Sequence, residues 1–230
     1  VSLESAVEKV RGGSFALPHL EKPDNEIGRL ASHFETMTDT LEHSTRELER
    51  KVAQRTDELN RLARVDALTG LKNRRGLDEA LDEEIQRAKR QNTGFGLIWL
   101  DIDHFKAIND ELGHQAGDDI LCRVALWLKA GVRPYDHPGR WGGDEFVVVL
   151  SPCDEDTLCQ IAARIRETIE RDSIRTGTPV TVSVGGYLCQ PGDDVDTILR
   201  QADQALYRVK QQGRNKVLIT DGSGQEINPA

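Results

Sequence analysis

Apolar residues recur with helical spacing in the first part of the chain. Ile27, Leu30, Phe34, Met37 and Leu41 follow one another at intervals of 3, 4, 3 and 4 residues, as in a coiled-coil seam. The seam continues through Thr45, Leu48, Val52, Arg55, Leu59 and Leu62. Charged residues crowd the other faces, so we expect a long helix that buries its seam against a second chain. The alternative is a single amphipathic helix packed on its own domain.

Two features interrupt this seam. From Met37 to Leu41 to Thr45 the spacing is 4 and then 4, a stutter that locally unwinds a supercoil. Thr45 and Arg55 are polar and weaken the packing. Before the seam, residues 1–10 are expected to form a short helix that ends at a Gly-Gly pair, and Asp24 is expected to cap the long helix.

The pattern changes at Val65, where apolar strand-like runs begin to alternate with amphipathic helices. Strands are predicted at 94–100 (GFGLIWL), 145–150 (EFVVVL) and 180–184 (VTVSV), and helices at 120–129, 158–171 and 195–211. This alternation predicts an α+β domain with helices around a central sheet. The residues after Asp221 are rich in Gly, Ser, Asn and Pro, so a frayed tail is expected.

Composition narrows the class of partner. The 230 residues carry a formal net charge of −9, and they show no basic stripe of the kind that binds DNA or RNA. The four cysteines form no CxxC pair, so free thiols in a reducing compartment are expected. No apolar run reaches the length of a membrane span. The chain begins with Val1, and we expect it to be part of a longer protein.

Gly142 and Gly143 lie immediately before the apolar strand 145–150, where they are expected to form a hairpin turn. Glycine lets the backbone turn tightly and lets a ligand approach without a Cβ in the way. Asp144 and Glu145 follow as adjacent carboxylates. An ordinary Gly-Gly turn with solvated acids is the alternative.

Asp101 stands at the end of the buried strand 94–100, an edge where α/β sheets place ligands. A carboxylate between apolar neighbours is costly to bury unless it is paired. If this strand lies beside 145–150, Asp101 and Asp144 face each other and form an oxygen-rich site suited to Mg²⁺. The alternative is that Asp101 or Asp103 caps the following helix.

Taken together, four segments resemble the GGDEF family of diguanylate cyclases in order and spacing over about residues 65–220. They are 66–75 (DALTGLKNRR), 101–110 (DIDHFKAIND) with 113–114 (GH) and 117–118 (GD), 142–146 (GGDEF), and 202–207 (ADQALY) with Lys210 and 213–215 (GRN). The resemblance implies a mostly antiparallel central sheet surrounded by helices, similar to nucleotidyl cyclase and polymerase palm folds. It also implies that two GTP molecules are condensed into cyclic di-GMP and pyrophosphate across a homodimer.

The same resemblance implies a role for each matching residue. The metal ligands would be Asp101, the Ile102 carbonyl, Asp144 and Glu145, with Mg²⁺, or Mn²⁺ in its place, as the cofactor. Either Asp144 or Glu145 would take the hydroxyl proton, and Lys106 would assist catalysis. Guanine would be read by Asn109 and Asp118. The remaining substrate contacts would be Phe105, Lys106, Gly142, Gly143, Lys210 and Arg214.

Arg133 and Asp136 form an RxxD pattern five residues before the glycine turn. It is similar to the inhibitory product site of part of the family, where a planar guanidinium grips phosphate and guanine. Arg164 is expected to be a second contact. The alternative is an ion pair at a helix end.

The N-terminal part resembles a truncated HAMP domain, on the basis of 25–30 (NEIGRL), Phe34 and Met37. The expected division is therefore 1–40 partial HAMP domain, 41–64 coiled-coil signalling helix, 65–222 GGDEF domain and 223–230 disordered tail. This resemblance implies a longer protein anchored on the cytoplasmic side of the bacterial inner membrane.

Three alternative functions stay open at this point. The domain could be a catalytically silent receptor for GTP or cyclic di-GMP, a dimerising relay module, or a cyclase for another purine nucleotide. The complete GGDEF signature argues against the first, and Asn109 with Asp118 argues against the other two.

Overall fold

The structure is a computed structural model, and it describes residues 25–223 and 225–227. The chain divides at residue 60 into two compact units, which are considered separately. The predicted helix 1–10, its Gly-Gly stop and the Asp24 cap lie outside the described residues.

The first unit is built on α2, a helix of 39 residues from Glu26 to Arg64. Asn25 caps it, because its Oδ1 accepts hydrogen bonds from the N–H groups of Ile27 at 3.0 Å and Gly28 at 3.2 Å. The prediction of one long helix is confirmed.

The predicted seam of α2 faces outward in this single chain. Ile27 is 61 % exposed, Leu30 56 %, Met37 51 % and Leu41 44 %. Such a row of large apolar side chains is costly to leave in water and is typical of an interaction surface. The hydroxyl groups of Ser32, Thr36, Thr38, Thr40 and Thr45 each donate to the carbonyl four residues earlier.

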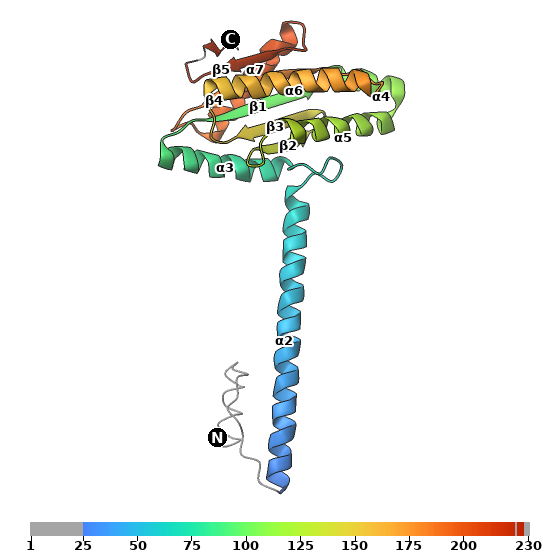
Figure 1. The fold of residues 1–230 in the computed structure, drawn as a ribbon, viewed down its shortest axis with the longest axis vertical. Helices are drawn as coiled ribbons and strands as arrows, with labels where there is room; N and C mark the ends of the chain where they lie inside the picture. The colour runs from blue at the N-terminus through green and yellow to red at the C-terminus, as the bar shows by residue number, and fades with distance from the viewer. Residues whose placement is uncertain (1–24, 224, 228–230) are drawn as a thin grey trace. The chain divides into compact units, whose positions relative to one another are not determined.

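The second unit contains a six-stranded sheet in the order β2-β3-β1-β4-β5-β6 (Figure 1). Its strands are β1 (Phe95–Ile102), β2 (His137–Gly142), β3 (Glu145–Leu150), β4 (Val182–Cys189), β5 (Val217–Thr220) and β6 (Glu226–Ile227). Only the β4–β5 pair is parallel. The predicted mostly antiparallel sheet is confirmed.

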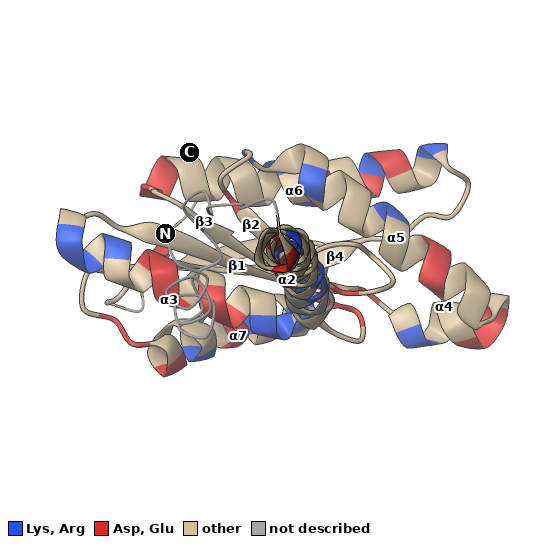
Figure 2. Ribbon diagram, turned by 90° about the horizontal axis from the view of Figure 1, so that it is seen from below, with Lys and Arg blue, Asp and Glu red and all other residues tan. Residues whose placement is uncertain are grey.

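Helices cover both faces of this sheet. They are α3 (Arg74–Gln91), α4 (Phe105–Leu112), α5 (His114–Gly131), α6 (Glu155–Arg175) and α7 (Val195–Gln211). The helices α5 and α6 pack on one face, and α3 and α7 on the other. Figure 2 shows acidic and basic residues interspersed along these helices. The domain therefore has three layers, helix, sheet and helix.

The central strand β1 is apolar at almost every position because both of its faces are covered. Ile98 and Leu100 point towards α5 and α6, whereas Leu97 and Trp99 point towards α3 and α7. All four are less than a tenth exposed. This packing holds the end of β1, where Asp101 lies, in a fixed position.

Two predicted elements, β3 and α7, have the predicted bounds, and the other predicted elements are longer than expected. The strand β2 was not predicted, since its sequence HPGRWG contains Pro and Gly; an edge strand tolerates both. The expectation of a disordered tail from 223 is wrong for β6, because Ile227 is 8 % exposed and pairs with Ile219. An apolar side chain with a partner strand keeps this segment ordered.

Two general expectations can also be checked in the described residues. All four cysteines are free thiols, as predicted. Within the part of the chain that the structure describes, no helix is both long enough and apolar enough to cross a bilayer.

Candidate active site

The predicted acidic residues meet at one edge of the sheet. In the antiparallel register of β1 and β3, Asp101 lies opposite Glu145. The N–H of Ile102 donates to the carbonyl of Asp144 at 3.3 Å. Lys210 reaches this edge from α7, with its Nζ 2.8 Å from Asp101 Oδ2. Three segments far apart in the sequence, 101–102, 144–145 and the end of α7, are thus brought together.

Electrostatics at this edge favour a cation. Burial raises the pKa of Asp101, and the neighbouring Asp144 and Asp103 raise it further, whereas Lys210 opposes the rise. Burial and the charge of Asp101 likewise raise the pKa of Glu145. The carboxylates therefore repel one another, and one ammonium group does not neutralise them all.

The residues present fit a divalent metal ion completed by substrate. Among the described residues, no three His, Cys, Asp or Glu side chains converge as a ready-made metal cluster. Mg²⁺ is usually held by one or two carboxylates together with phosphate oxygens and water rather than by an all-protein cage. Asp101 and Glu145, in register on adjacent strands, provide such a partial set.

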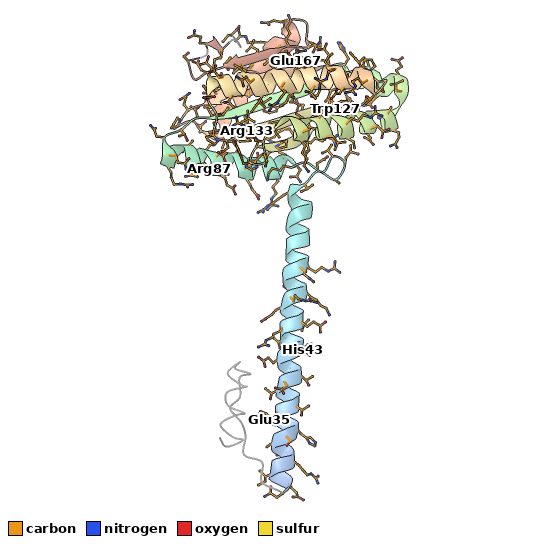
Figure 3. The ribbon with its side chains drawn as sticks, in the orientation of Figure 1. Glu35, His43, Arg87, Trp127, Arg133 and Glu167 are labelled. Atoms are coloured by element: carbon orange, nitrogen blue, oxygen red, sulfur yellow. The ribbon has the colours of Figure 1, made fainter. Side chains whose placement is uncertain are left out.

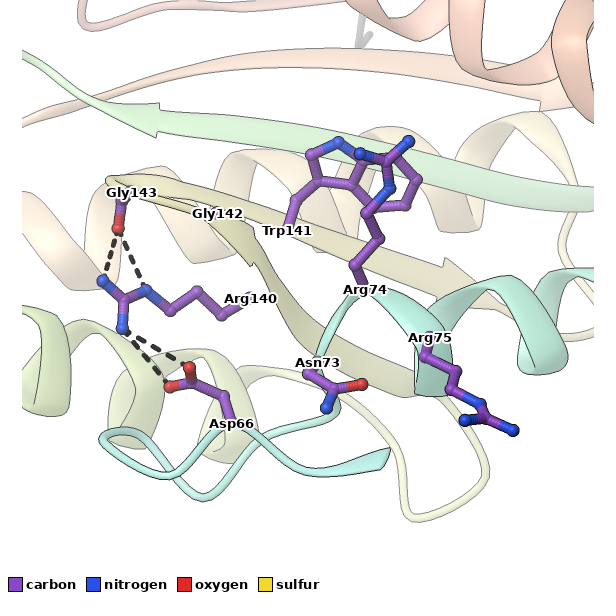
Figure 4. Close-up of a pocket in the computed structure, with 8 residues that line it drawn as sticks. All are labelled: Asp66, Asn73, Arg74, Arg75, Arg140, Trp141, Gly142 and Gly143. Carbon is purple, nitrogen blue, oxygen red and sulfur yellow. Dashed lines mark hydrogen bonds and ion pairs between the residues drawn. The ribbon is translucent and has the colours of Figure 1, made fainter. Parts of the chain in front are cut away.

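The glycine turn between β2 and β3 is held by Arg140, as Figure 4 shows. Its Nε and one terminal nitrogen donate to the Gly143 carbonyl at 2.9 and 2.7 Å. Its other terminal nitrogen lies 3.4 Å from Asp66 Oδ1. Burial alone would raise the pKa of Asp66, but hydrogen bonds from Thr69 and the charge of Arg140 hold it below its usual value. Gly143 has a φ of 54°, which a residue with a Cβ rarely adopts.

Sequence reasoning missed Arg140 and Asp66, which hold the glycine turn. Asp66 begins the 66–75 motif and Arg140 lies two residues before the 142–146 motif, but their partnership joins positions 74 residues apart. They border a pocket of about 520 Å³ next to the glycine turn. In that pocket the guanidinium of Arg74 lies 4.6 Å from the ring centroid of Trp141 (Figure 4).

The predicted guanine-binding residues lie on α4 and α5. Gly113, with a φ of 84°, separates the two helices and lets them fold back on each other. Asn109 packs against Gly117, and its Oδ1 is buried without a hydrogen-bond partner. A buried acceptor of this kind is free to bond with a ligand or with a water molecule. Asp118 follows Gly117 on α5 and is half-buried.

The predicted phosphate contacts surround the acidic edge. Phe105 and Lys106 begin α4 immediately after the end of β1. Lys210 is in the last turn of α7, and the exposed Arg214 follows that helix. The alternative that Asp101 or Asp103 caps α4 is wrong, because the residue at the cap position is His104.

The RxxD residues lie at the other end of β2. Arg133 is in the loop before β2 (Figure 3) and lines a pocket of about 450 Å³. Asp136 is 5 % exposed, and it accepts hydrogen bonds from the backbone N–H groups of Arg133 at 2.7 Å and Ser151 at 3.3 Å. Arg164 donates to the Gly131 carbonyl at 2.5 Å. Asp136 and Arg164 thus brace the loop that presents Arg133. The alternative of an ion pair at a helix end is wrong for Asp136, because this carboxylate accepts hydrogen bonds from backbone N–H groups instead.

The family model described as "Diguanylate cyclase, GGDEF domain" matches residues 63–216. The match covers more than half of the chain, and the chain belongs to this family. GGDEF diguanylate cyclases generally depend on a divalent metal ion. The domain seen in the second unit is therefore a GGDEF domain.

Known relatives agree with this assignment. Diguanylate cyclase DgcZ of Escherichia coli K12 is 34 % identical over 160 residues, which cover 68 % of this chain and 53 % of DgcZ. Diguanylate cyclase DgcM of the same strain is 34 % identical over 217 residues, which cover 88 % of this chain and 52 % of DgcM. The chain spans about half the length of these two relatives.

A solved structure extends the likeness beyond the GGDEF domain. The coiled coil and GGDEF domain of DgcB from Caulobacter crescentus, in complex with c-di-GMP, matches with a TM-score of 0.73 and 31 % identity. The match covers 80 % of this chain and 100 % of the DgcB chain. The combination of a long helix and a GGDEF domain is thus shared with a protein of known structure.

Proposed function

We propose that this chain is a diguanylate cyclase, which condenses two GTP molecules into cyclic di-GMP and two pyrophosphates. The observation that supports it most is the acidic edge of β1 and β3 beside the glycine turn, with Asn109 Oδ1 left unsatisfied nearby. A phosphate site and a base-reading site are both expected of an enzyme that joins nucleotides.

The reaction consists of two transfers, one in each direction, and each forms a bond between the 3′-oxygen of one nucleotide and the α-phosphorus of the other. The bond from that phosphorus to the bridging oxygen breaks, and pyrophosphate leaves with the electron pair. Asp144 or Glu145 accepts the 3′-hydroxyl proton, because both lie at the edge where that hydroxyl would approach. A bound Mg²⁺, or Mn²⁺ in its place, would neutralise charge on the phosphates during this transfer.

The chain's own residues bind and orient GTP. Asn109 and Asp118 accept and donate hydrogen bonds at the guanine edge, where a carboxylate suits the N1–H and the exocyclic amine. The start of α4, with Phe105 and Lys106, presents backbone N–H groups and an ammonium to the triphosphate. Lys210, which contacts Asp101 in this structure, shares its charge with the phosphates when substrate binds. Arg214 adds a second cation from the end of α7.

One GGDEF domain binds one GTP, so two copies of the chain have to meet. The outward-facing row of Ile27, Leu30, Met37 and Leu41 fits a second copy of α2 as its partner. Pairing through this helix raises the effective concentration of one GGDEF domain for the other. The HAMP assignment of 1–40 and membrane anchoring of a longer protein stay predictions, since residues 1–24 lie outside the described part.

Product inhibition is part of the proposal. Arg133 lines a pocket that also contains Asp154 and Thr157 at the start of α6, and a guanidinium there suits a phosphodiester. Burial raises the pKa of Cys153 in that pocket to about 12, so the thiol there is uncharged. The carboxylate of Asp154 lines the same pocket, and the charge of Arg133 counteracts its repulsion of an anion. Asp136 and Arg164 act through the loop that they brace.

Phosphorus NMR of the purified chain with GTP tests the proposal, with Mg²⁺, with Mn²⁺ and with a chelator. We expect two pyrophosphates for each cyclic dinucleotide, formed only when a divalent metal is present. GTP that binds without being consumed under any of these conditions would identify a silent receptor instead.

A further inference from the structure

Asp103 is a buried carboxylate beside the active site that the proposed reaction does not use. It is 5 % exposed and lies two residues after Asp101. Its Oδ1 accepts a hydrogen bond from Ser183 Oγ at 2.6 Å. Its Oδ2 accepts from Thr181 Oγ1 at 2.7 Å and from the N–H of Asn215 at 3.1 Å. Three donors satisfy a charge that would otherwise be costly to bury.

The last of these donors belongs to a strained segment. Gly213, Arg214 and Asn215 have φ values of 100°, 63° and 48° in succession. Two residues with side chains therefore occupy the left-handed region, which only surrounding contacts can maintain. The N–H of Arg214 donates to the Val209 carbonyl at 3.1 Å, which ties the segment back to α7.

The side chain of Asn215 is held from the opposite side by α6. Its Nδ2 donates to Glu170 Oε1 at 2.8 Å, and its Oδ1 accepts from Arg166 at 3.1 Å. Arg166 and Glu170 are themselves paired at 2.7 Å. With Asp103 on the backbone side, Asn215 is fixed between β1 and α6.

Arg214 is the residue between these anchors, and its own side chain is exposed. Asp103 belongs to the β1–α4 connection, which lies between Asp101 in β1 and Lys106 in α4. The hydrogen bond from Asn215 to Asp103 therefore fixes the position of the Arg214 backbone, and with it the point from which the Arg214 side chain extends, relative to the acidic edge. No other contact described above joins this segment to that connection.

We propose that Asp103 is a positioning residue for triphosphate binding, acting through Asn215 on Arg214. This inference rests on the proposed function, in which Arg214 contacts the GTP phosphates. Asp103 itself touches no substrate. Its removal should weaken the binding of the triphosphate and leave the binding of guanine and its first phosphate unchanged.

The test compares Asp103→Asn with Ser183→Ala as a matched control. The first variant turns an acceptor of the Asn215 N–H into a neutral amide. The second removes another hydrogen bond to the same carboxylate but leaves the Asn215 bond in place. Both should lower the melting temperature, so a purely structural effect is common to the pair.

Binding is measured by calorimetry, with GMP and with a GTP analogue that has a methylene bridge between the α- and β-phosphates, so that no turnover occurs. For Asp103→Asn we expect the Kd of the analogue to rise about tenfold or more, the equivalent of one charge-assisted hydrogen bond. The Kd of GMP should not change. In turnover, KM for GTP should rise more than kcat falls. Ser183→Ala should bind both nucleotides as the wild type does.

If Asp103→Asn fails to fold, Asp103→Ser replaces it, because the shorter, neutral side chain does not reach the Asn215 N–H. That variant should show the same selective loss of analogue binding. Equal loss of GMP and analogue binding, or no loss of either, in the folded variant would overturn the positioning role. Wild-type protein that binds the analogue but makes no product would refute the cyclase alone, whereas wild type that binds neither nucleotide would overturn both proposals.

Discussion

Gly117→Ala should weaken the binding of guanine nucleotides while leaving the stability of the fold nearly unchanged. A Cβ at position 117 would overlap Asn109 Oδ1 and lie 2.9 Å from Asn109 Cγ. It would also lie 3.2 Å from Phe105 Cζ. Asn109 carries its amide at the end of a rotatable side chain, so we expect this group to swing away while the helices keep their places.

The magnitude follows from what Asn109 would lose. Its hydrogen bonds to guanine are worth about 1–3 kcal/mol in total, which corresponds to a 5- to 150-fold rise in the Kd of GTP. Position 117 lies inside α5 without a positive φ, so alanine improves helix propensity by about 1 kcal/mol relative to glycine. That gain offsets part of the cost of moving Asn109, and the melting temperature should change little.

Gly131→Ala is the matched control, because it makes the same change at the other end of α5. Its Cβ would meet Ile165 Cγ1 at 3.4 Å, an ordinary contact distance. Calorimetric titration with GTP, GMP and ATP should show weaker guanine nucleotide binding in Gly117→Ala alone, with unchanged weak binding of ATP. Wild-type affinity for GTP in Gly117→Ala would refute the assignment of Asn109 to the guanine edge.

Three further outcomes are expected. Arg140→Lys should lower kcat/KM by about tenfold or more at nearly unchanged stability, because an ammonium cannot reproduce the two hydrogen bonds that the guanidinium donates to the Gly143 carbonyl. A wild-type kcat/KM in steady-state kinetics would contradict this role of Arg140. Burial raises the pKa of Asp101 and of Glu145, so protons should compete with Mg²⁺ at a higher pH than for ordinary carboxylates. The rate at low Mg²⁺ should therefore fall as the pH drops through these raised pKa values. If excess Mg²⁺ does not move this loss of rate to lower pH, competition between protons and Mg²⁺ is not its cause. Arg133→Ala should relieve inhibition by added cyclic di-GMP without changing the initial rate, and equal inhibition of variant and wild type would remove the product site.

The raised pKa values of Asp101 and Glu145 also predict that ionising these two groups lowers the free energy of unfolding. A carboxyl group with a higher pKa in the folded state binds its proton more tightly there than in the unfolded chain. Its contribution to stability is therefore most favourable at low pH and is lost as the pH rises through the folded-state pKa. Ionisation of Asp101 and Glu145, which the proposed metal site requires, therefore costs some folding stability.

Local pattern was enough to predict the elements with strong apolar periodicity. The strand β3 and the helix α7 have the predicted bounds, because each buries a clear stripe of apolar side chains. The sequence left open whether β1 and β3 are neighbours; the structure pairs them and places Asp101 opposite Glu145 rather than opposite Asp144. The edge strand β2 escaped prediction, since an edge position permits Pro and Gly that an interior strand excludes.

Partnerships between distant side chains were beyond such reasoning. Asp103 looked like a helix cap, but its three donors lie 78, 80 and 112 residues further along the chain. Asp136 looked like a ligand or an ion-pair partner, whereas it bonds to backbone N–H groups that only the folded loop brings together. The role of a carboxylate depends on which hydrogen-bond donors the fold places next to it, and the local spacing of residues does not predict those donors.

The most direct test of the central claim is chromatography with mass spectrometry of the products that wild type and Asp144→Ala form from GTP and Mg²⁺. The expected result is cyclic di-GMP from the wild type and none from the variant, with both proteins folded by circular dichroism. Equal product from the two proteins would contradict the active site at the edge of β1 and β3, and a different product from the wild type would contradict the proposed reaction.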